Sequence, residues 1–181
     1  MVTDISSHRR AGVPHISAQE IVSTARKMGA VNAKVIQSHT IFLGNWTRLK
    51  CQFGCPHFGR TFTCPTFTPT TQEMSDILLD YEKAVVVEAK QAADVHRLVL
   101  ALETHFREMG FNKAFALGAQ PCNLCDVCTV ETHCEHPDKA RPTLQGCSVD
   151  ISRTLMQIGW NDAAKPEPCS GQQTVGMVLI D

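Results

Sequence analysis

Four cysteines gather in one short stretch of the sequence at intervals typical of metal ligands. They are separated by two, two and five residues and are Cys122, Cys125, Cys128 and Cys134. Three thiols at two-residue intervals, with a fourth just beyond, form a ligand pattern of iron–sulfur clusters, because soft thiolates stabilise iron in both oxidation states. The first two intervals match the bacterial ferredoxin pattern, and only the last interval is longer. The spacing therefore predicts a complete [4Fe–4S] cluster on this stretch.

Zinc is the main alternative for these thiols. Structural zinc usually takes two CxxC or CxxH pairs some distance apart, and a triplet of cysteines fits that arrangement poorly. His133 and His136 lie close by and offer nitrogen ligands, but we expect both side chains to be exposed to solvent. A zinc-stabilised interaction module is therefore kept as an alternative to the iron–sulfur protein.

A second group of cysteines lies upstream and has three members, Cys51, Cys55 and Cys64. Three thiols leave a four-ligand metal site one position short. The candidates for the fourth position are Cys147, Cys169, His57 and an exogenous molecule. Cys147 would close the site, and we include it among the predicted metal ligands, with one or two clusters in total. A vacancy would instead let the metal bind a substrate, which favours a redox or sulfur-transfer enzyme.

Composition and charge exclude several classes of function. The chain has 181 residues, 43% hydrophobic residues and a formal net charge of −1. The basic residues are scattered, so we expect no nucleic-acid partner. No apolar run reaches the roughly 18 residues of a membrane span, and the first residues do not form a secretory signal. We expect a cytoplasmic protein without membrane contact, whose nine cysteines do not form disulfides and mostly bind metal.

Helical and strand patterns alternate along the chain and predict the α/β class. Residues 1–16 are expected to be a flexible lead-in, and 17–181 a single domain with cysteine-rich loops at 44–71 and 118–147. The expected helices cover 17–29, a segment starting after Thr70 or Thr71, 91–109 and 144–158. The expected strands cover 33–37, 40–43, 84–87, 113–117 and 174–180. We predict a mixed sheet flanked by helices, with His96 and His105 on the solvent side of the long helix.

Both cysteine groups carry a resemblance to a known family. The upstream block reads Arg48-x2-Cys51-x3-Cys55-Pro56, then Thr63-Cys64-Pro65. The downstream block reads Pro121-Cys122-x2-Cys125-x2-Cys128, Cys134-x2-Pro137, Lys139-Ala140-Arg141-Pro142, Cys147 and Asp150. These blocks resemble the predicted metal-binding proteins of domain of unknown function 2284, which are common in anaerobic bacteria and archaea. The family tends to have Ser, Glu, Ala and Gly where this chain has Thr143, Gln145, Gly146 and Ser148.

The resemblance implies an iron–sulfur or other metal protein and implies no established reaction. Together with the cysteine spacing, it predicts a cytoplasmic iron–sulfur protein that transfers electrons to a partner enzyme or a maturation system. The partner is expected to be a redox protein, and the oligomeric state is left open.

Overall fold

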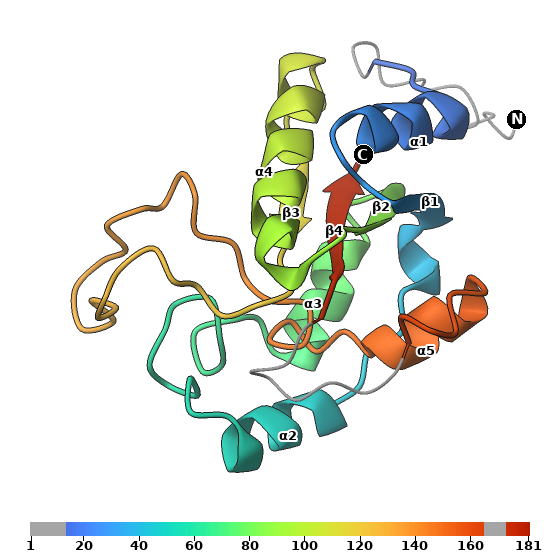
Figure 1. The fold of residues 1–181 in the computed structure, drawn as a ribbon. Helices are drawn as coiled ribbons and strands as arrows, with labels where there is room; N and C mark the ends of the chain where they lie inside the picture. The colour runs from blue at the N-terminus through green and yellow to red at the C-terminus, as the bar shows by residue number, and fades with distance from the viewer. Residues whose placement is uncertain (1–13, 165–172) are drawn as a thin grey trace, which may run out of the picture.

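Four strands form one antiparallel sheet in the order β1–β2–β4–β3 (Figure 1). They are β1 (Asn32–Gln37), β2 (Lys83–Glu88), β3 (Phe115–Leu117) and β4 (Val175–Ile180). The computed structural model describes residues 14–164 and 173–181. The two central strands are buried on both faces, as the continuous apolar run of β2 predicts. Val85 of β2 pairs with Val35 on one side and with Val178 on the other.

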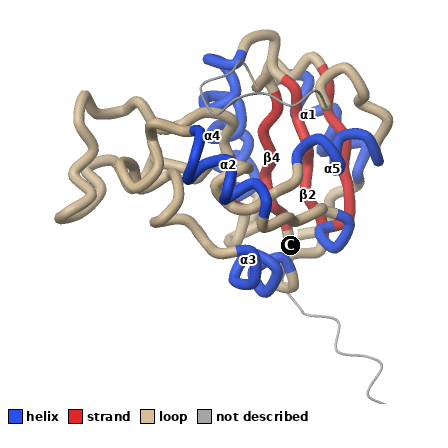
Figure 2. The backbone as a smooth tube through the Cα atoms, turned by 90° about the horizontal axis from the view of Figure 1, so that it is seen from below, coloured by secondary structure: helices blue, strands red, loops and turns tan. Residues whose placement is uncertain are grey.

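Helices cover both faces of this sheet (Figures 1 and 2). On one face, α1 (Ala18–Lys27) and α4 (Ala92–Glu108) pack against Val85 and Val87. On the other face, α3 (Thr71–Leu78) and α5 (Ile151–Gln157) pack against Ala84 and Val86. Successive side chains of a strand point to opposite faces, so this one apolar run serves two hydrophobic cores.

Local signals at the helix ends act as the sequence predicts. The Ser17 hydroxyl accepts from the Glu20 backbone N–H at 3.2 Å, and the Glu20 carboxylate accepts from the Ser17 N–H at 2.9 Å. Thr70 and Glu73 form the same reciprocal capping box before α3. These hydrogen bonds lower the pKa of both carboxyl groups, that of Glu20 chiefly through the Ser17 side chain. Both helices therefore begin within a residue of the predicted positions.

The structure differs from the expected elements in several places. The sheet is antiparallel throughout, whereas a mixed sheet was expected, and parallel pairing within the described ranges is limited to the isolated bridge of Gly118 with Thr143. The strand expected at 40–43 is a short 3₁₀ helix, Ser38–Thr40, and an isolated bridge at Leu43. The last helix starts at Ile151 and not near residue 144, because turns occupy 144–148 between the bridge residues Thr143 and Val149.

The loop expected at 44–71 contains a helix, α2 (Trp46–Gly54). Its buried residues are Thr47 and Cys51, whereas Leu49 and Phe53 are exposed. No apolar stripe therefore faces the protein interior, which is why hydrophobic periodicity does not reveal this helix. The expected lead-in falls largely on residues 1–13 and the candidate ligand Cys169 on 165–172, both outside the described residues.

Candidate metal centre

The four downstream cysteines line a single cavity. Their loop leaves the sheet at the end of β3 and projects away from the helices (Figures 1 and 2). The other lining residues are Phe62, Thr63, Leu124, Thr129, Glu135, His136 and Ala140. Each of the four thiol residues is half-buried, so the loop turns its cysteines toward one hollow. The donor set fits a thiolate-ligated metal or cluster.

The spread of these donor atoms distinguishes two kinds of metal site. The donor atoms of Cys125, Glu135 and His136 lie within 4.8 Å of one another. Among the described residues, no three cysteine sulfurs come that close together. Tetrahedral zinc with Zn–S bonds of about 2.3 Å brings its sulfurs to about 3.8 Å from one another. The four thiols are therefore more widely spaced than zinc ligands, whereas the Cys–Glu–His group suits a single ion.

This geometry corrects one expectation and agrees with another. His136 was expected to be exposed, but it is half-buried and lines the cavity, because the segment after Cys134 folds back over the hollow. His133 is exposed, and its backbone carbonyl accepts a hydrogen bond from the Thr129 hydroxyl at 2.6 Å.

The surroundings of Cys122 and Cys125 favour the protonated form of these two thiols in the absence of metal. Desolvation raises the pKa of Cys122, and neighbouring Cys128 and Cys134 add to the rise. Desolvation and then the Glu135 carboxylate raise the pKa of Cys125. A bound cation reverses this balance, because metal ligands must be thiolates. Loading the site therefore releases protons.

The three upstream cysteines line a second cavity. Cys51 lies in the last turn of α2, and its carbonyl accepts from the backbone N–H of Cys55 at 3.1 Å. Cys51 and Cys64 are buried, at 4% and 5% exposure. The remaining lining residues are Phe58, Pro65, Ala119, Pro121, Thr143 and Gln145. The structure thus brings the upstream cysteines together and adds two polar residues from a distant turn.

The two cavities share a wall. Thr63 lines the downstream cavity, and the next residue, Cys64, lines the upstream one. In the other segment, Pro121 lines the upstream cavity and the next residue, Cys122, lines the downstream one. The Cys122 N–H donates to the Thr63 hydroxyl at 3.1 Å, and the Thr143 N–H donates to the Thr63 carbonyl at 3.0 Å. Thr63 is 3% exposed. One buried residue therefore ties together the segments that carry both cysteine groups.

Cys147 lies in the hydrophobic core and lines neither cavity. It is 1% exposed and belongs to the cluster that α3 and α5 cover. Burial raises the pKa of its thiol to about 12, and the Cys64 thiol is near enough to add to that rise. His57 is half-buried and also lies outside both linings. Their roles as metal ligands stay predictions, because neither residue lines the upstream or the downstream cavity.

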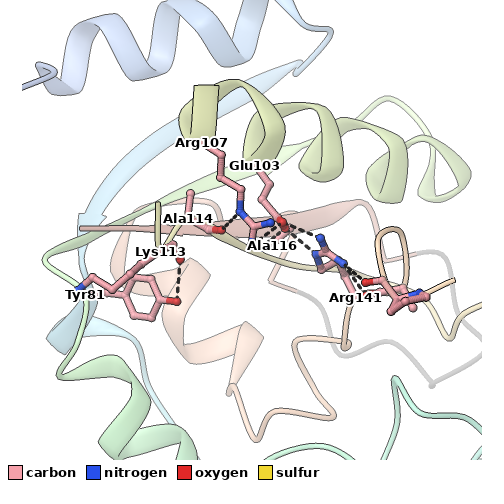
Figure 3. Close-up of polar contacts among 9 residues, drawn as sticks. Tyr81, Glu103, Arg107, Lys113, Ala114, Ala116 and Arg141 are labelled. Atoms are coloured by element: carbon pink, nitrogen blue, oxygen red, sulfur yellow. Dashed lines mark hydrogen bonds and ion pairs between the residues drawn. The ribbon is translucent and has the colours of Figure 1, made fainter. Parts of the chain in front are cut away.

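A buried ion pair anchors both ends of the downstream loop (Figure 3). The Glu103 carboxylate, on α4, accepts from the Ala116 N–H of β3 at 2.8 Å, where the loop begins. It also accepts two hydrogen bonds of 2.6 Å from the Arg141 guanidinium, where the loop ends. Arg141 donates further to the carbonyls of Ala140 and Pro137. Arg107 forms a more exposed ion pair with Glu103 at 3.1 Å.

His96 lies two helical turns before Glu103 on α4 and contributes to the same junction. It was expected on the solvent side of the helix, but its Nε2 is buried without a hydrogen-bond partner among the described residues. Burial lowers the pKa of His96, a hydrogen bond to the Lys139 backbone opposes this effect, and Arg141 adds to it. His105 is half-buried with its ring against Phe106.

Sequence reasoning missed Glu103, although a signal was present. Glu103 occupies a core-facing position among Val99, Leu102 and Phe106, and a buried carboxylate requires a partner. Thr143 and Gln145 carried no such signal, because only the fold brings their turn beside the upstream cysteines.

The fold and the two cavities define an α/β protein with thiol-rich candidate metal sites. The chain belongs to the family of predicted metal-binding proteins (DUF2284), whose model matches residues 34–180. Comparison with curated proteins and with solved structures gives no match. Within the described ranges, every helix is too short or too polar to cross a membrane. Metal binding is thus supported by family membership as well as by the donor set.

Proposed function

We propose that this protein is a cytoplasmic iron–sulfur protein of anaerobic metabolism that passes electrons to a partner enzyme or a maturation system. Cys122, Cys125, Cys128 and Cys134 hold a [4Fe–4S] cluster, and the upstream cysteines hold a second centre. The observation that supports this proposal is that four thiols line one cavity and three more line a cavity that shares its wall. When bound, such clusters supply one-electron redox chemistry.

The protein's own residues support transfer between two such centres. Thr63 and Cys64 are neighbours in the chain, and so are Pro121 and Cys122. In each pair the two residues line different cavities, although their Cα atoms are only about 3.8 Å apart. The Thr63 hydroxyl bridges these two segments through its bond to the Cys122 N–H. Phe62 and Leu124 add apolar surface to the downstream cavity, which limits solvent access and influences redox potential.

The test is anaerobic purification with iron, sulfide and zinc analysis. We expect iron and sulfide in equal amounts, about eight of each if both centres are four-iron clusters. The Cys125→Ser variant should lose the downstream share, whereas Asp126→Asn, a neighbouring change outside the donor set, should retain it. Stoichiometric zinc without iron or sulfide would refute the proposal.

The convergence of Cys125, Glu135 and His136 favours a second candidate, a zinc-stabilised interaction module. A soft thiolate, an imidazole and a carboxylate together suit a single divalent ion. The variant His136→Ala separates the two functions. It should lower zinc content strongly if the single ion is native, and leave iron and sulfide unchanged if the four thiols hold a cluster.

A further inference from the structure

We infer that the upstream centre is an open-coordination site that binds a small organic thiol as its thiolate, in the cavity that Gln145 also lines. The inference rests on the proposed function, since it requires a metal centre on Cys51, Cys55 and Cys64. It adds a ligand-binding site to what is otherwise an electron carrier. No bond beyond metal coordination forms, and the thiol releases its proton to solvent.

Among the residues that the structure describes, three thiols line the upstream cavity and a fourth does not. Its other polar lining residues are Thr143 and Gln145, brought by the turn that follows Arg141. The Thr143 hydroxyl accepts from the Gly146 N–H at 3.0 Å and keeps its own hydrogen to donate. A carboxamide and a hydroxyl are poor ligands for iron of a sulfide cluster, but both can donate hydrogen bonds to a bound anion.

Among the described residues, Cys147 follows the turn that lines this cavity, and its packing argues against a role as the fourth ligand. It belongs to the hydrophobic core under α3 and α5, with 1% exposure, and it does not line the cavity. The turn around it is held by Thr68 and Arg48, whose side chains donate to the Gly146 carbonyl at 2.7 and 3.5 Å. These hydrogen bonds fix the turn that carries Cys147, whose side chain is packed in the core.

Charge and shape indicate which ligand the site takes. The segment 44–71 carries three basic residues and no acidic residue, whereas 118–140 carries four acidic residues and one lysine. The upstream centre therefore lies in the more positive surroundings, which favour an anionic ligand. Its walls include Phe58, Ala119 and Pro121, which suit a short hydrocarbon chain. Thiolate is the anionic donor that iron–sulfur centres prefer.

The experiment uses full-length protein carrying Cys122→Ser and Cys125→Ser, so that the upstream centre alone contributes to the spectrum. 2-Mercaptoethanol is added anaerobically, with ethylene glycol as its hydroxyl counterpart. We expect saturable changes in the visible and electron paramagnetic resonance spectra with the thiol and none with the glycol. Gln145→Cys should supply a fourth thiolate and weaken the response at least tenfold, whereas Gln52→Cys, at an exposed position of α2 that lines neither cavity, should keep it.

Two results would overturn the inference while leaving the proposed function intact. One is an iron–sulfur spectrum that the thiol does not change. The other is loss of the upstream spectrum in Cys147→Ser together with normal folding by circular dichroism, which would make Cys147 the fourth ligand. Absence of iron and sulfide from the wild-type protein would overturn both proposals at once.

Discussion

Removal of Arg141 should destabilise the fold far more than removal of its exposed neighbour Arg107. The Glu103 side chain is 2% exposed, and that of Arg141 is 7% exposed. Arg141→Met leaves a buried carboxylate without its bidentate partner, which costs about 3–5 kcal/mol in the free energy of unfolding. Arg107→Met removes a side chain that is 45% exposed and should lower the free energy of unfolding by less than about 1 kcal/mol.

The measurement is urea unfolding of the metal-free, reduced variants, followed by circular dichroism. Small domains are stable by about 5–15 kcal/mol, so the Arg141 variant should unfold at a much lower urea midpoint. The double variant Glu103→Leu with Arg141→Met should recover part of the loss, because it leaves no unpaired buried charge.

Cluster loading gives a second, independent reading of the same prediction. Arg141 ends the downstream loop, so its loss should lower iron bound at Cys122–Cys134 more than iron bound by the upstream group. The reasoning is refuted if Arg141→Met and Arg107→Met have midpoints that differ by less than the equivalent of about 1 kcal/mol.

Three further outcomes are expected, each measured by urea unfolding of the metal-free protein. Gly176→Ala should lower the free energy of unfolding by about 1–3 kcal/mol, because its Cβ would lie 2.6 Å from Val99 Cγ1. Gly54→Ala is the matched control and should change this free energy little, because its Cβ would enter open space. Ser148→Gly should be more stable than Ser148→Ala by about 1 kcal/mol, because Ser148 has a φ of 63° and only glycine adopts that conformation without strain; equal stabilities would argue against this strain. The pKa of His96 is lowered in the folded protein, so the unfolded chain binds a proton at this position at a higher pH. The free energy of unfolding should therefore fall as the pH drops through about 6.5. His96→Gln should reduce this pH dependence, and an unchanged pH dependence in the variant would contradict the prediction.

Features encoded by neighbouring residues were predictable from the sequence. The capping box of Ser17 and Glu20 places the start of α1, and the periodic apolar residues from Val95 to Phe106 place α4. The spacing of the downstream cysteines also indicated one shared site, since a short loop can turn all four toward one point. In each case the interaction spans few residues, so the local pattern contains most of the information.

Features that depend on distant segments were not predictable in this way. The direction of each strand depends on pairings such as that of Val85 with Val178, which local periodicity does not specify. The neighbourhood of Gln145 and Cys51 likewise arises only when the turn after Arg141 packs beside α2. The apolar pattern does not predict α2, because a cysteine and a threonine, not large apolar residues, form its buried side.

The place of β4 in the sheet has a consequence for the order of events during translation. Both cysteine groups precede β4 in the sequence, yet β4 is the strand that pairs with β3, from which the downstream loop departs. A nascent chain therefore presents its seven cavity-lining thiols to the cell before their scaffold is complete. Metal delivered at that stage would bind cysteines of an incompletely folded chain, whereas metal delivered after β4 has folded would bind in two formed cavities.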